Sequence, residues 1–195
     1  MSAFAAANFT FDSASLKRLP ISLQRIWIGL LAGAGIVATG AFACAAPFAA
    51  VAMLAAATLP LRQALAVTAA LWLGNQIVGF SLLGYPTDGE TLIWGAVMAI
   101  ASIAATFIAH RTGQAMTQKP ALLRLVALFI AAFATYEAGL LLGSAVVPAN
   151  GAFAPDIVAY VAFVDATWAI GLGAAYAGLQ ILAGMPALTG FRRRA

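Results

Sequence analysis

Residues 91–109 read TLIWGAVMAIASIAATFIA and contain no charged side chain. A helix needs about 20 consecutive apolar residues to cross the hydrocarbon core of a membrane, which is about 30 Å thick. Residues 61–83, 121–147 and 156–184 are similarly apolar. The breaks between these four stretches are rich in residues that favour turns, such as glycine and proline. We therefore predict four membrane-spanning helices between residue 61 and residue 184.

The preceding stretch, residues 21–59, is too long for one spanning helix. At 1.5 Å per residue it would form a single helix of about 58 Å. Gly40 and Pro47 bracket a segment that favours a turn. We therefore predict two spans, residues 21–39 and 47–59, the second short enough to be tilted or enclosed by other helices. The sequence as a whole predicts an all-α, polytopic membrane protein with six transmembrane helices.

Composition excludes a water-soluble domain. The chain has 195 residues, of which 64% are hydrophobic and 8% charged, and its mean hydropathy is +0.98. Soluble domains carry about 25% charged residues, so the polar side chains here could not cover a folded surface in water. The ten Lys and Arg residues are too scattered to form a face that binds nucleic acid. One cysteine and one histidine leave no metal motif of the CxxC or HExxH kind.

The charged residues predict the orientation of the chain. With six spans and a cytoplasmic N-terminus, all ten basic residues fall in the inner loops and tails. The outer loops then hold Asp88, Glu90 and Asp156 and no base. Five spans would separate the N-terminal bases from the others, against the positive-inside rule. We expect a cytoplasmic or interfacial tail (1–20), a six-helix membrane domain (21–185) and a basic cytoplasmic tail (186–195).

Polar side chains gather at one depth in three predicted spans. Glu137 and Asp165 both lie about 14 Å below the outer ends of their spans, and Asn75 and Gln76 lie at a similar depth. A charged side chain inside a membrane costs at least about 2.5 to 3.5 kcal/mol. We therefore expect this layer to form a cavity that opens outward. In the alternative, these groups hydrogen-bond one another and only fix the register of the helices.

Aromatic side chains complete the predicted binding site. Tyr136 adjoins Glu137, and Trp168 follows Asp165 within one turn. Tyr85 and Trp94 belong to an outer loop and the start of the next span, where they could instead be interfacial anchors. The full set of predicted site residues is Cys44, Trp72, Asn75, Gln76, Tyr85, Trp94, Tyr136, Glu137, Asp165 and Trp168.

Cys44, the only cysteine, lies in the predicted outer turn between the first two spans. A thiolate is a soft ligand that suits cobalt, copper or zinc, and it can also act as a nucleophile. The alternative is a small apolar residue in an alanine-rich turn. In the first span, small residues recur at four-residue spacing at Gly29 and Gly33 and at Ala34 and Ala38, where they allow another helix to approach closely. That helix could belong to the same bundle or to a partner.

Three short segments carry a family resemblance. Residues 43–48 read ACAAPF, residues 59–64 read LPLRQA and residues 71–76 read LWLGNQ, with Gly79-Phe80 and Gly84-Tyr85-Pro86 after them. With six spans in about 190 residues, they resemble BtuM, a small proteobacterial family of vitamin B12 transporters related to the S-components of energy-coupling factor (ECF) transporters.

This resemblance implies a transport protein of the bacterial inner membrane, without an intrinsic cofactor, that captures cobalamin or a related corrinoid from the periplasmic side. It implies that Cys44 is a ligand of the corrinoid cobalt. It also implies an S-component-like bundle whose first helix docks, through Gly29, Gly33, Ala34 and Ala38, on the membrane subunit of an ECF energising module with ATPases.

Other functions remain open from the residues alone. A proton-coupled carrier of a small solute or cation would use Glu137 and Asp165. A membrane enzyme would use Cys44 as its nucleophile, but no base is placed to activate it. A structural or assembly subunit would use the polar layer only for folding. The sequence has no GxxxxGK[ST] loop, so we expect any ATP hydrolysis to belong to other chains.

Overall fold

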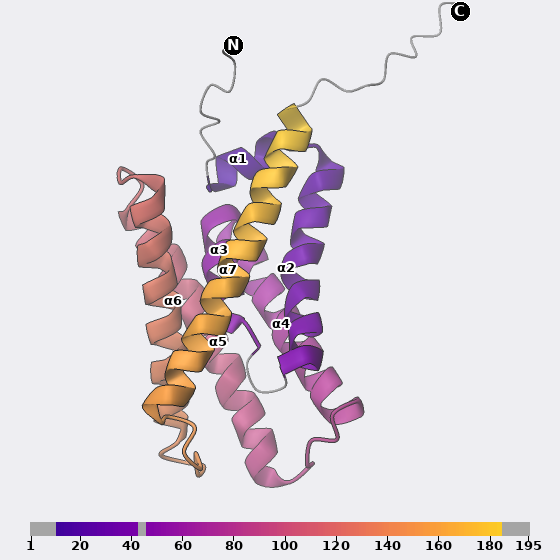
Figure 1. Ribbon diagram of the computed structural model, residues 1–195, viewed down its shortest axis with the longest axis vertical. Helices are drawn as coiled ribbons and strands as arrows, with labels where there is room; N and C mark the ends of the chain where they lie inside the picture. The colour runs from indigo at the N-terminus through magenta and orange to yellow at the C-terminus, as the bar shows by residue number, and fades with distance from the viewer. Residues whose placement is uncertain (1–10, 43–45, 185–195) are drawn as a thin grey trace, which may run out of the picture.

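The part of the chain described by the computed structural model, residues 11–42 and 46–184, is entirely helical (Figure 1). This part forms seven helices and no strand, in the order α1 (Ser13–Arg18), α2 (Ile21–Phe42), α3 (Phe48–Thr58), α4 (Leu61–Ser81), α5 (Gly89–Ala115), α6 (Ala121–Gly143) and α7 (Pro155–Gly184). Five of these helices, α2 and α4 to α7, are long and apolar enough to cross a membrane. The predicted all-α class and multi-pass membrane character are therefore confirmed.

The helix boundaries follow local sequence signals. Pro60 and Pro120 directly precede α4 and α6, where a missing N–H costs nothing because the first N–H groups of a helix have no partner within it. The carboxylate of Asp88 accepts a hydrogen bond of 2.8 Å from the backbone N–H of Thr91 and so caps the start of α5. Gly151 has φ of +83° in the connection between α6 and α7, a conformation that glycine adopts without strain.

The second predicted span, residues 47–59, is shorter than the other five spans. It forms α3, whose 11 residues extend only about 16 Å, roughly half of the hydrocarbon core. Every residue of α3 is buried, because the helix packs against α4, α5, α6 and α7. The expectation that this segment would be enclosed by other helices is confirmed, while its length falls short of a span of its own.

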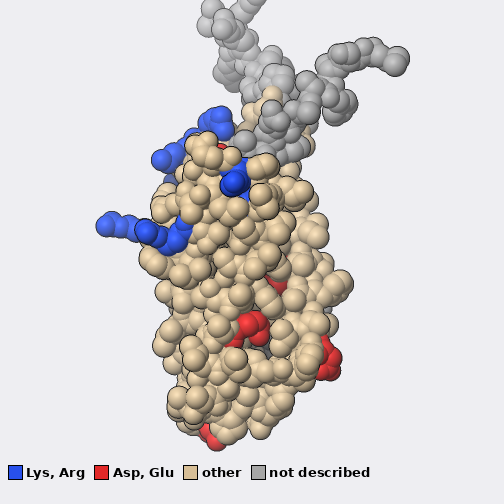
Figure 2. Space-filling model, turned by 90° about the vertical axis from the view of Figure 1, so that its left-hand side faces the viewer, with Lys and Arg blue, Asp and Glu red and all other residues tan. Residues whose placement is uncertain are grey.

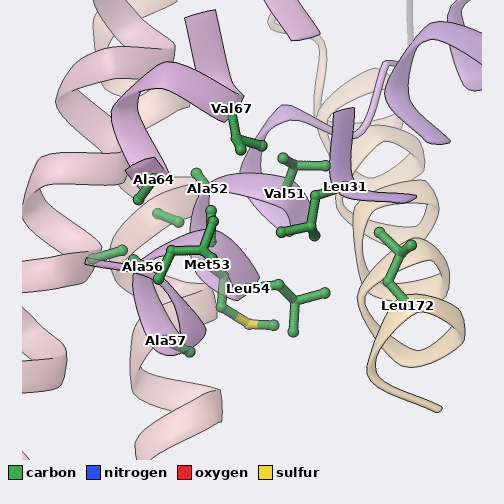
Figure 3. Close-up of a cluster of buried hydrophobic side chains, with 14 of the residues drawn as sticks. Leu31, Val51, Ala52, Met53, Leu54, Ala56, Ala57, Ala64, Val67 and Leu172 are labelled. Carbon is green, nitrogen blue, oxygen red and sulfur yellow. The ribbon is translucent and has the colours of Figure 1, made fainter. Parts of the chain in front are cut away.

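The core of the protein forms around α3 (Figure 3). Val51, Met53 and Leu54 of α3 pack among apolar side chains of the surrounding helices, including Leu31 of α2 and Leu172 of α7. Because α3 is rich in alanine, the longer helices can approach it closely on all sides. Helix α3 therefore occupies the centre of the bundle.

Close helix packing uses glycines other than those predicted. A Cβ atom at Gly35 would overlap a leucine of α4, and one at Gly74 would overlap an isoleucine of α2. A Cβ atom at Gly29 or Gly33 would meet nothing within 4 Å. Ala38 is fully buried, so it is not available to a partner helix in this conformation. The predicted small-residue face of α2 is therefore divided between an open part and a part inside the core.

The charged side chains are segregated along the bundle. Figure 2 shows Lys and Arg at the upper end of the molecule, while most acidic side chains on that face lie in its lower half. The described basic residues are Lys17, Arg18, Arg25, Arg62, Arg111, Lys119 and Arg124, which belong to α1, the starts of α2, α4 and α6, and the end of α5 with the segment that follows it. We call this the basic end. The opposite end, with the α4–α5 and α6–α7 connections (Figure 1) and with Asp88, Glu90 and Asp156, is the acidic end.

The short helix α1 packs across the basic end (Figure 1). Its Leu16 is buried, and the hydroxyl oxygens of Ser15 and Tyr176 lie 2.9 Å apart. The ring of Tyr176 also packs against the ring of Trp27, with centroids 4.7 Å apart. The indole N–H of Trp27 donates to the hydroxyl of Thr58, at the end of α3, over 2.9 Å. Helix α1 and these side chains therefore cover part of the basic end.

Candidate binding site at the acidic end

Two neighbouring cavities lie near the acidic end of the bundle. The larger, of about 500 Å³, lies among α5, α6, α7 and the α6–α7 connection. The smaller, of about 200 Å³, lies between α4 and α5. Ala46, Trp94 and Met98 line both cavities, so the two spaces share a wall. Ligand cavities in proteins typically have volumes of about 300 to 1,000 Å³.

The smaller cavity contains the predicted amide side chains of α4. The side-chain N–H of Asn75 donates to the hydroxyl of Thr39 in α2 over 3.0 Å. The side-chain N–H of Gln76 donates to the side-chain oxygen Oδ1 of Asn75 over 3.1 Å. Asn75 is 2% exposed, whereas Gln76 is half-buried. Asn75 therefore ties α2 to α4, and Gln76 presents the more accessible polar group to the cavity.

Glu137 lines the larger cavity together with Tyr136. Its side chain is half-buried and has no hydrogen bond to any residue within the described ranges. The ring of Tyr136 stacks on Phe48, the first residue of α3, with centroids 5.3 Å apart. Within the apolar spans a carboxyl group without a protein partner is costly. Glu137 is therefore a polar group of this cavity that is able to meet a ligand or a proton.

Asp165, another predicted site residue, contacts the start of α3. Its carboxylate accepts a hydrogen bond of 2.7 Å from the backbone N–H of Ala50, the third residue of α3, and its side chain is 1% exposed. The positive end of the helix dipole favours a negative charge at this point. Asp165 is not among the residues that line either cavity. It therefore holds the start of α3 in place from behind the site.

The predicted aromatic residues divide into two groups. Trp94 lines both cavities and donates its indole N–H to the carbonyl of Pro148 over 3.3 Å. Tyr85 lines the smaller cavity and packs edge-on against Phe80. Trp72 donates its indole N–H to the carbonyl of Gly95 over 2.8 Å. Trp72 and Trp168 pack against the core and are absent from both cavity linings.

Some lining residues escaped the sequence analysis, and one predicted residue lies outside the described ranges. Met98 follows Trp94 by four residues, so helical periodicity could have placed it on the same face. Tyr160 lines the larger cavity one turn into α7, where its aromatic ring near a span end was a usable signal. Ala46 carried no signal. Cys44 lies outside the described residues, two positions before Ala46 in the sequence.

Asp88 at the acidic end carries a negative charge. Hydrogen bonds from Thr91, chiefly from its backbone N–H, lower the pKa of the exposed Asp88 below its usual value. Asp88 is therefore ionised at neutral pH.

Within residues 11–42 and 46–184, no group of three His, Cys, Asp or Glu side chains could hold a metal ion.

No protein family, no curated protein and no solved structure matches the chain.

Proposed function

We propose that this protein is a membrane transport or substrate-binding component that captures its ligand from the acidic side of the bundle. The observation that carries the proposal is the pair of adjoining cavities at this end, in which Gln76 and Glu137 offer polar groups among aromatic and apolar walls. At the basic end, α1 and its contacts with Tyr176 cover part of the surface, and one smaller pocket of about 190 Å³ remains there. The larger combined space at the acidic end favours capture from that end.

We further propose six crossings of the bacterial inner membrane, with both termini in the cytoplasm. The segregation of the described bases at one end supports this orientation, because positive charge is retained on the cytoplasmic side. The ends of α3 support the number of crossings. Ala46, just before α3, lines the cavities near the acidic end, and Leu59, just after it, shares a small pocket with Asp12 near the basic end. In this arrangement residues 46–59, which contain α3, connect the two ends as the second crossing.

For the ligand, we propose cobalamin or a related corrinoid, with Cys44 as a ligand of the cobalt. The support is the sequence resemblance in residues 43–86 together with the place of Ala46 in the walls of both cavities. Trp94 and Tyr85 would contact the edge of the corrin ring, and Gln76 and Glu137 would meet its amide side chains. An ECF energising module is the proposed partner, and the open positions Gly29 and Gly33 of α2 support a docking face there.

Purification in detergent with cobalamin present tests this proposal. We expect the wild-type protein to retain a corrinoid absorption spectrum after gel filtration. The variant Cys44→Ala should alter that spectrum, since a thiolate on cobalt changes the ligand field. Ser81→Ala, which removes an exposed hydroxyl near the acidic end of α4, is the matched control and should leave the spectrum unchanged. Wild-type protein that retains no colour at micromolar cobalamin would refute the proposal.

A proton-coupled carrier is the second candidate, and one observation favours it. Glu137 is a half-buried carboxyl group in a cavity within a span, without a hydrogen bond to the described residues, which is typical of groups that exchange protons or cations. The other carboxyl of this hypothesis, Asp165, is already bonded to α3. If this candidate is correct, Glu137→Gln abolishes the proton-driven uptake of the solute or cation into vesicles. Cys44→Ala leaves the same uptake unchanged.

A further inference from the structure

A cleft between α6 and α7 opens at the level of the apolar spans, on the basic side of the bundle. Its volume is about 370 Å³. Figure 1 shows α6 and α7 diverging toward the upper, basic end, because α6 packs on α5 and α3 whereas α7 packs on α3 and α2. The cleft is lined by Phe11, Met53, Leu54, Leu122, Leu125, Val126, Phe129, Ala166, Ala169, Ile170 and Gly173, all of which are apolar.

The shape and lining of this cleft restrict what can fill it. Its floor is formed by Met53 and Leu54 of the central helix α3, and protein interiors of this kind are close-packed. Water is disfavoured because an apolar cavity offers it no hydrogen-bond partner. Along α6 the cleft runs from Leu122 to Phe129, about 10 Å. A hydrocarbon chain is slender and apolar enough to lie along a cleft of this length and lining.

One basic side chain, Arg124, lies next to the cleft through its contact with Phe11, and it also borders a small pocket together with Asp12. Arg124, in the first turn of α6, donates a hydrogen bond to the backbone carbonyl of Phe11, whose ring lines the cleft. Arg124 has five N–H donors in all, so donors remain for another group. Lys119 is exposed in the segment that leads into α6. Basic side chains beside a gap between spanning helices are suited to an anionic lipid headgroup.

We infer that this cleft is a binding site for one anionic phospholipid. One acyl chain lies between α6 and α7 against α3, and the phosphate lies against Arg124 and Lys119. This inference is independent of the proposed function, because it concerns a different surface.

Native mass spectrometry of the delipidated full-length protein, titrated with phosphatidylglycerol or phosphatidylcholine, tests the inference. We expect one phosphatidylglycerol to bind more tightly than phosphatidylcholine. Gly173→Leu should abolish this binding by filling the cleft, because a Cβ at Gly173 would meet only the Phe11 ring, at 3.9 Å. Arg124→Gln should weaken it about fivefold, since a basic side chain near a lipid phosphate contributes about 1 kcal/mol. Ala174→Leu, at an exposed position of the same helix that does not line the cleft, is the matched control.

Equal binding of the two lipids by the wild-type protein would overturn the inference. Unchanged phosphatidylglycerol binding in Gly173→Leu would overturn it as well, because the lipid would then be elsewhere. Inorganic phosphate at millimolar concentration should not displace the lipid, since the acyl chain supplies much of the affinity. Displacement by phosphate alone would show a site for a free anion and would also count against the inference.

Discussion

The bond between Asp165 and the start of α3 gives the sharpest stability prediction. Asp165→Ala removes the acceptor and leaves the backbone N–H of Ala50 buried without its partner. Loss of a helix cap costs about 0.5 to 2 kcal/mol, and an unsatisfied buried donor costs about 1 to 3 kcal/mol. These two ranges describe the same loss, so we expect a destabilisation of about 2 kcal/mol. Asp165→Asn keeps one oxygen acceptor, but it removes the charge at the helix start and places an NH2 group at a buried position, so it should cost at least about 1 kcal/mol.

The free energy of unfolding can be measured in mixed micelles of mild detergent and dodecyl sulfate, with helix content followed by circular dichroism. Thr167→Ala is the matched control, because this exposed hydroxyl bonds only to the carbonyl of Phe163 in its own helix. We expect it to change the free energy of unfolding by less than about 0.5 kcal/mol. The reasoning is refuted if Asp165→Ala unfolds with the same free energy as Thr167→Ala, since the buried bond would then contribute nothing.

Three further predictions concern packing, the cover at the basic end and pH. Gly74→Val should destabilise the protein by more than about 1 kcal/mol, because the valine side chain would overlap α2. Gly29→Val, at an open position, should leave thermal stability in detergent nearly unchanged. Equal effects of the two substitutions would contradict the predicted packing of α2 on α4. Tyr176→Phe removes the hydroxyl that contacts α1. A cysteine placed at Leu16, in a Cys44→Ser background, should then react about fivefold faster with maleimide, because the contact contributes about 1 kcal/mol. An unchanged rate would argue against the contact. The pKa of Asp88 is lowered in the folded protein, so its contribution to folding stability is fully present above the unfolded-state pKa and is lost as pH falls through the folded-state pKa. The stability difference between wild type and Asp88→Ala should therefore shrink in acid. A difference that grows in acid would contradict the cap.

The five long helices could be predicted from the sequence because each is an apolar stretch bounded by turn formers. The prediction was least accurate at the end of α5, which continues six residues beyond Ala109, since polar residues such as Arg111 and Gln114 are compatible with a helix that extends past the hydrocarbon core. The length of α3 was nearly correct. Hydropathy alone cannot distinguish a helix surrounded by lipid from one surrounded by protein, so its central position had to come from the structure.

The candidate site was predictable in depth and only partly in detail. Counting residues from the span ends placed Asn75, Gln76 and Glu137 at the level of the cavities, because the rise per residue of a helix is fixed. The same count could not reveal which way each side chain points. Asp165 shares that depth but faces the start of α3, and this contact depends on how the two helices cross. Gly35 and Gly74 likewise acquire their role only from the pairing of α2 with α4.

The bond between α7 and α3 also constrains how the protein is made. A segment as short as α3 cannot be released into the lipid as a stable span of its own, and the carboxylate that completes its first turn belongs to the last helix. Synthesis proceeds from the N-terminus, so α3 waits for more than one hundred residues of later chain before its final partner leaves the ribosome. The centre of the bundle is therefore completed late in synthesis, and a nascent chain truncated before α7 should remain open to proteolysis there.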